Sequence, residues 1–232
     1  MLHRVGALTL LCGAIAVGLL PTAAKADVTS PQAIQIAATD TNFGPGTAIN
    51  DPMIFNQFNP TLGTLNSVSV SVLYDFSHSA TVTFYTPGMF TTAATNNNLS
   101  VTLSNGQQIA SATAPDYSQN TTFNAATMTL NNPVNLPSVT NSGAVGPVSL
   151  TSAADLALFT GNGTVSIPVL ASSVANFTTN NGNGAGLVTT QADAKVTVSY
   201  NYTPNAVPEP SSVVLLGLGG CGLLWYRRRR AV

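Results

Sequence analysis

Apolar and polar side chains alternate in short runs along most of the chain, and this two-residue period restricts the fold more than any other feature of the sequence. Such runs are typical of β-strands with one buried face, because successive side chains of a strand point to opposite sides. The alternating apolar residues are Val68, Val70, Val72 and Tyr74; Ala80, Val82 and Phe84; Leu99, Val101 and Leu103; Met128 and Leu130; Val148 and Leu150; Val165, Ile167 and Val169; and Val196, Val198, Tyr200 and Tyr202.

Turn-forming residues separate these runs. The pair Asn105-Gly106 is a strong hairpin signal and places Ile109 on the returning strand. Further turns are expected at Asp75–Ser79, Pro87-Gly88, Asn96–Asn98, Asn131-Asn132-Pro133 and 180–186. One short helix, capped by Ser152 and ended by Gly161, is the exception. The pattern predicts an all-β fold, an antiparallel β-sandwich.

The N-terminal segment has the features of a secretory signal peptide. Arg4 gives a short positive region, and the stretch Val5–Leu20 is apolar and uncharged. Ala24 and Ala26 are small residues at the two positions that a signal peptidase reads. We therefore predict a signal helix in residues 1–26, removed by cleavage before Asp27, with an uncleaved anchor helix as the alternative.

The C-terminal segment, residues 207–232, has three consecutive parts. Pro208, Glu209 and Pro210 form a stiff, extended entry. An apolar run follows and predicts a single transmembrane helix, which Arg227, Arg228, Arg229 and Arg230 end on the cytoplasmic side. The 16 residues from Ser211 to Tyr226 are fewer than the roughly 20 that span a bilayer comfortably. A temporary anchor therefore fits this segment better than a permanent one.

This order of motif, apolar run and basic stop resembles the PEP-CTERM sorting signal of Gram-negative bacteria. In that family an exosortase, a membrane-embedded cysteine protease, handles the tail during export. The resemblance implies that Pro208, Glu209 and Pro210 are the recognition element and that Arg227–Arg230 are the stop. It also implies transient partners: the exosortase, the signal peptidase and the inner membrane.

The segment between the two ends, residues 27–206, is long enough for one domain with a core. Cys12 and Cys221 both lie in the end segments, so this domain has no disulfide. Lys195 is its only basic residue, against seven aspartates. That balance argues against nucleic-acid binding, which needs a Lys/Arg footprint.

Parts of this domain also resemble bacterial choice-of-anchor E domains, which are surface domains without an assigned enzymatic activity. The similar segments are Phe58–Leu65, Phe159–Val165, Gly184–Leu187 and Ala194–Pro204. We therefore expect a non-enzymatic protein without a cofactor. After an inner-membrane intermediate it reaches the cell surface or matrix of a Gram-negative bacterium and associates with exopolysaccharide in a biofilm. A carbohydrate-binding, lectin-like surface module is the alternative.

Other chemistry has few candidate residues. His78 stands near Asp75, Ser77 and Ser79, but no Gly-x-Ser-x-Gly elbow accompanies them, and a polar hairpin tip is the simpler interpretation. One histidine is too few for a zinc site. Calcium ligands would come from Asp40, Asn42, Asp51 and Asp116, although turn-forming roles explain these residues as well. Stacking against a sugar would fall to Tyr74, Tyr85, Tyr117, Tyr200 and Tyr202.

Overall fold

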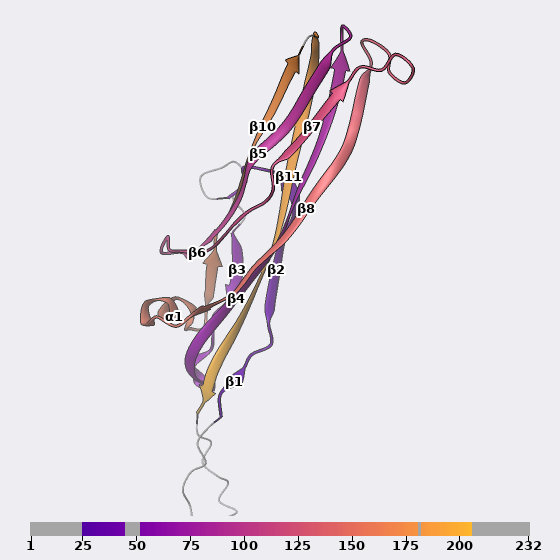
Figure 1. Cartoon of the computed structure of the whole chain (residues 1–232). Helices are drawn as coiled ribbons and strands as arrows, with labels where there is room; N and C mark the ends of the chain where they lie inside the picture. The colour runs from indigo at the N-terminus through magenta and orange to yellow at the C-terminus, as the bar shows by residue number, and fades with distance from the viewer. Residues whose placement is uncertain (1–24, 45–51, 181, 206–232) are drawn as a thin grey trace, which may run out of the picture. The chain divides into compact units, whose positions relative to one another are not determined.

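A computed structural model describes residues 25–44, 52–180 and 182–205 of the chain (Figure 1). Residues 26–203 form one compact unit, which we call the domain. Its strands are β1 (Asp27–Val28), β2 (Gln32–Asp40), β3 (Met53–Asn56), β4 (Gly63–Phe84), β5 (Met89–Thr102), β6 (Gln108–Thr113), β7 (Tyr117–Thr122), β8 (Pro133–Leu150), β9 (Thr164–Ile167), β10 (Val169–Asn180) and β11 (Gly184–Pro204). The helices are the 3-10 turn η1 (Pro60–Leu62) and α1 (Ala153–Phe159).

The strands form three sheets, and their pairings, where resolved, are antiparallel. Sheet A has the order β1-β11-β4-β8, with β2 also paired to β11. Sheet B has the order β10-β5-β6, with β7 also paired to β5, and β3 pairs with β9 in a small third sheet. Figure 1 shows β1 and the C-terminal end of β11 at one end of the sheets, and the β4–β5 connection at the other.

Two apolar clusters fill the space between sheets A and B. The large cluster contains buried residues of both sheets, among them Val70 on β4, Leu99 on β5 and Val196 on β11. The small cluster contains Phe84 and Phe90, whose ring centroids lie 4.5 Å apart where β4 leads into β5. Burial of these side chains is the main driving force for bringing the two sheets together.

The all-β class is confirmed, and so are several local predictions. Ser152 caps α1 by accepting a hydrogen bond from the backbone N–H of Asp155, at 3.1 Å. The Asn105-Gly106 turn joins β5 to β6, which carries Ile109. In the described part of the chain no helix is long and apolar enough to cross a membrane. The expected signal helix and C-terminal transmembrane helix fall outside the described residues.

Four local predictions are wrong, wholly or in part. The turn expected at 180–186 is shorter, because β10 runs to Asn180 and β11 begins at Gly184. The segment Asp75–Ser79 is no hairpin tip but the middle of the 22-residue strand β4. The segment Asn96–Asn98 is no turn between strands, because β5 continues through it with Asn96 at a φ of 54°. Met128 and Leu130 do not lie on a strand, since they belong to a turn region that packs on the small cluster.

Candidate sorting and processing site

The first residues after the expected signal-peptidase site pair with the end of the last strand. In the β1–β11 pair, Asp27 lies opposite Tyr202 and Val28 opposite Asn201. Thr29 extends this pairing: its backbone N–H donates to the Tyr200 carbonyl at 2.9 Å, and its hydroxyl accepts from the Tyr200 N–H at 3.1 Å. The two ends of the domain are therefore held side by side.

Two tyrosines fix this end of β11 to the core. Tyr200 is buried, and its ring meets those of Phe58 and Phe159 edge-on, at 6.0 and 6.2 Å between centroids. Its hydroxyl donates to the Asn56 carbonyl at 2.6 Å, and burial raises the pKa of Tyr200 to about 12. Tyr202 contacts Phe58, and its hydroxyl donates to Asp27 Oδ2 at 3.3 Å. Desolvation, and then the charge of Asp27, raise the pKa of Tyr202.

The predicted processing residues divide between the described and undescribed parts of the chain. Ala26 and Asp27 lie at the start of the domain. Ala24, the motif Pro208, Glu209 and Pro210, and the arginines Arg227–Arg230 lie outside the described residues. The structure therefore describes the two strand ends that lead toward the predicted processing residues.

The candidate catalytic group around His78 is not assembled. His78 is fully buried on the inner face of β4. Asp75, Ser77 and Ser79 have the opposite parity along this strand and so belong to the outer face of sheet A. Serine, histidine and aspartate thus lie on two sides of a sheet and cannot act as a triad there.

The candidate calcium ligands are not gathered either. Asp40 on β2 accepts a hydrogen bond from the Gln191 side chain at 3.3 Å, and Asp116 accepts one from the Asn96 N–H at 3.2 Å. Asn42 accepts a 3.4 Å bond from the backbone of Ser173, and Asp51 falls outside the described residues. Within the described ranges, no three His, Cys, Asp or Glu side chains are close enough to hold a metal ion.

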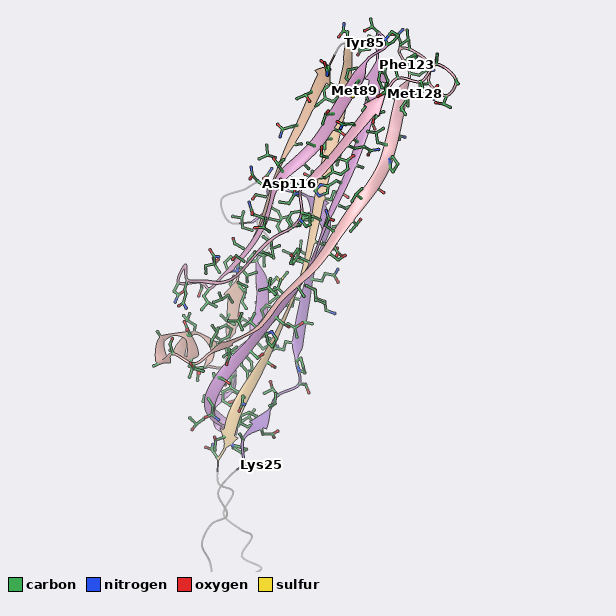
Figure 2. All side chains as sticks on the ribbon, in the orientation of Figure 1. Lys25, Tyr85, Met89, Asp116, Phe123 and Met128 are labelled. Carbon is green, nitrogen blue, oxygen red and sulfur yellow. The ribbon has the colours of Figure 1, made fainter. Side chains whose placement is uncertain are left out.

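Most of the candidate sugar-binding tyrosines are engaged in packing. Tyr117 and Tyr200 are buried, Tyr74 packs against the large cluster, and Tyr202 lies against Phe58. Tyr85 differs, because it is 45% exposed. Figure 2 shows it at the end of the sheets where β4 leads into β5.

The sequence interpretation missed a layer of buried polar side chains between the two apolar clusters. We call it the polar layer and define it by its residues: His78, Thr92, Asn97, Tyr117, Ser173 and Thr190. The signal was present at His78, which shares the parity of the apolar residues on both sides of it in β4. Its polar neighbours favoured a turn and concealed the continuous alternation.

Comparison with known proteins finds the sorting signal. The model of the PEP-CTERM protein-sorting motif matches residues 206–230, directly after the end of β11. This match supports exosortase-targeted sorting of an exported protein. No curated protein matches the chain.

Solved structures give only distant likenesses. The crystal structure of the T13 particle of infectious bursal disease virus matches at 9% identity and a TM-score of 0.19, covering 86% of this chain and 47% of the viral one. The structure of the Gx strain of the same virus matches at 16% identity and a TM-score of 0.15, covering 88% and 51%. The chain spans about half the length of these viral chains.

Proposed function

We propose that this is a non-enzymatic surface or matrix protein of a Gram-negative bacterium, released from an inner-membrane intermediate by an exosortase that recognises Pro208, Glu209 and Pro210. The observation that carries the proposal is the sorting motif at residues 206–230, which starts two residues beyond the last strand. A signal peptidase would cut before Asp27, at the other end of the same domain.

The pairing of β1 with β11 supports processing at both ends without damage to the fold. Strand β11 lies between β4 on one side and β1 and β2 on the other, so sheet A is complete only when the last strand is in place. Every partner of β11 lies within residues 27–84. Removal of both apolar end segments would therefore take no strand from the domain.

Sorting is tested by replacing Pro208, Glu209 and Pro210 with alanine in the host. We expect a full-length, membrane-retained product, and the same product from the wild-type chain in a host that lacks the exosortase. Asn205→Ser, which changes the residue between β11 and the motif match and leaves the motif intact, is the matched control and should be released normally. Equal release of the motif variant and the wild type would contradict the sorting proposal.

The proposed association with exopolysaccharide is best supported by the outer face of sheet B. None of the strands β5, β6, β7 and β10 contains an Asp, Glu, Lys, Arg or His. Their outward side chains are mainly hydroxyls and amides, some already paired across strands: Thr91 donates to Asn120 at 2.6 Å and Thr113 to Asn98 at 2.9 Å. An uncharged glycan can exchange hydrogen bonds with such a face, whereas a polyanion finds no cation there.

The structure offers a matched pair of variants for this partner. Thr91 and Asn120 form a Thr–Asn cross-strand pair on sheet B, and Thr81 and Asn135 form the same pair on sheet A, at 2.8 Å. We expect Thr91→Ala with Asn120→Ala to weaken retention of the exported protein on the host's neutral polysaccharide about tenfold, as for the loss of roughly 1.4 kcal/mol of hydrogen bonding. Thr81→Ala with Asn135→Ala should leave retention unchanged.

Four other results would change the assignment. Equal effects of the two double variants, or tighter retention on an anionic polysaccharide, would contradict the role of sheet B. Loss of saturable binding in Tyr85→Ala would favour the lectin-like alternative, which the exposed ring of Tyr85 supports. Hydrolysis of a glycan or peptide by the purified exported protein would contradict the non-enzymatic role.

A further inference from the structure

The polar layer interrupts the apolar core on each of the long central strands. On β4, His78 lies between Phe76 of the large cluster and Ala80 of the small cluster. Thr92 and Asn97 separate the two clusters on β5 in the same way, Ser173 does so on β10, and Thr190 on β11. The domain thus has two apolar cores with a polar layer between them, and such a layer divides the core into two units that can differ in local stability.

Four irregularities of the strands fall close to this level. The β4–β8 register shifts between His78 and Ala80, and the β10–β5 register shifts between Ser172 and Val174. On β5, Asn96 has a φ of 54°, and β11 shifts against β2 just after Ala192. The β4–β8 and β5–β6 pairs have one further shift each, at the level of the large cluster. A bulge removes a regular pair from the ladder and bends the strand, so the pairing is interrupted on several strands close to the polar layer.

Every member of the polar layer has a hydrogen-bond partner except His78. Ser173 donates to Asn97 Oδ1 at 2.7 Å, and Asn97 Nδ2 donates to the Pro115 carbonyl at 3.0 Å. Thr190 bonds Thr41, and the Tyr117 hydroxyl donates to Gln119 at 2.9 Å. Within the part of the chain described, neither ring nitrogen of His78 has a hydrogen-bond partner, although the ring is fully buried. The ring stacks on that of Tyr117, with 5.4 Å between the ring centroids and 17° between the ring planes.

Among the residues that the structure describes, no carboxylate faces His78. Asp75 on β4 and Asp193 on β11 belong by parity to the outer face of sheet A. There, desolvation and then repulsion from Asp75 raise the pKa of Asp193. From the β6–β7 connection, Asp116 is exposed and accepts the Asn96 N–H. Strands β5, β8 and β10 contain no charged residue, and β7 contributes only the phenol of Tyr117. An imidazolium at this position would have no counter-ion among the described parts of the chain.

We propose that His78 makes the polar layer an acid-sensitive hinge: protonation of its imidazole opens the end of the domain that contains the small cluster, while the large cluster stays folded. A buried cation without a hydrogen bond or counter-ion is strongly unfavourable, and in the opened state the ring regains water. The face of Tyr117 offers the cation some attraction, which does not replace the lost hydration.

The direction of the pH dependence follows from the neutral, buried ring. Burial lowers the pKa of His78 below the ordinary value of 6.5. The opened state therefore binds more protons than the closed state below pH 6.5, and opening becomes more favourable as the pH falls through this range. With one proton involved, the opening equilibrium shifts up to tenfold for each pH unit below 6.5, or up to roughly 30-fold at pH 5.

Hydrogen exchange on the full chain in detergent micelles tests the hinge. Between pH 7 and pH 5, with intrinsic exchange rates corrected for pH, we expect protection to fall up to roughly 30-fold at Phe84 and Phe90 and to stay constant at Val70 and Val196. His78→Phe, which keeps a ring for Tyr117 to stack on and removes the titration, should abolish the loss. Asp193→Asn should preserve it. Equal loss in both clusters, no loss in the wild type, or the same loss in His78→Phe would overturn the proposal.

A direct titration keeps the test decisive if His78→Phe does not fold. The chain has two histidines, His3 and His78, so imidazole NMR signals of the full chain can be assigned by comparison with a His3→Gln variant. We expect His78 to titrate below 6.5, together with the loss of the Phe84 and Phe90 amide protection. An ordinary or raised pKa for His78 would overturn the proposal.

Discussion

Tyr200→Phe removes one hydroxyl near the C-terminal end of β11, and the sign of its effect on the stability of the domain should reverse with pH. The variant keeps the ring contacts with Phe58 and Phe159 and loses the 2.6 Å bond to the Asn56 carbonyl. That carbonyl still accepts from the Gln32 side chain at 3.0 Å. The free energy of unfolding near pH 7 should therefore fall by about 1 kcal/mol, which lowers the Tm of a domain of this size by roughly 3 °C.

At alkaline pH the same substitution should stabilise the domain relative to the wild type. The pKa of Tyr200 is raised from 10.0 to about 12, so the unfolded chain loses this proton first. Wild-type stability then falls as the pH rises from 10 towards 12, by about 1.4 kcal/mol at pH 11 for this group. Phenylalanine cannot ionise, so the variant escapes this loss and the two stabilities should cross near pH 11.

Urea denaturation of the wild type, Tyr200→Phe and the control Tyr202→Phe, at pH 7 and at steps up to pH 11.5, measures both effects. Tyr202→Phe removes only an exposed 3.3 Å bond to Asp27 and should cost less than about 0.5 kcal/mol at pH 7. A cost for Tyr202→Phe equal to that of Tyr200→Phe would refute the reasoning about burial. Parallel pH profiles of the wild type and Tyr200→Phe would refute the reasoning about ionisation.

Two further substitutions, each with a control variant, test a close backbone contact and a buried hydrogen bond. Gly44→Ala should destabilise the domain by about 3 kcal/mol, because φ is +121° and the new Cβ would lie 2.5 Å from the Val169 carbonyl oxygen. The control Gly106→Ala, at a φ of +84° with no atom near the new Cβ, should lower the stability by only about 1 kcal/mol. Equal losses of stability in thermal denaturation would refute the steric argument. Ser173→Ala should lower the free energy of unfolding by about 1–3 kcal/mol, because it leaves Asn97 Oδ1 buried without its donor. The control Thr113→Ala removes an exposed hydrogen bond and should change the free energy of unfolding by no more than about 0.5 kcal/mol. No change in Ser173→Ala would show that water replaces the serine hydroxyl.

The sequence was informative wherever one local rule acted alone. Alternation identified the second half of β11, since Val196, Val198 and Tyr200 are all buried. The Asn105-Gly106 turn and the Ser152 cap were predicted from their own chemistry, which does not depend on distant residues.

The failures arose where local chemistry and strand periodicity disagreed. The segment from Asp75 to Ser79 is polar enough for a turn, yet Phe76 and His78 keep the inward parity of Val72 and Val82. Asn96 likewise favours a turn, but in the fold its positive φ forms an irregularity inside β5. The pairing of β1 with β11 joins residues more than 170 positions apart, so no local pattern reveals it.

The candidate site was predictable only in part. The sorting motif at residues 206–230 is a local signal within one short segment, so sequence alone could identify it. The uncharged outer face of sheet B and the polar layer depend on which strands become neighbours, and composition along the chain does not determine that.

The intact mass of the protein recovered from outside the host cell reports both proposed cleavages in one measurement. We expect a chain that begins at Asp27 and ends near Pro208–Pro210, with any attached sugar visible as added mass. Mature extracellular material that still contains Arg227–Arg230 would contradict this expectation.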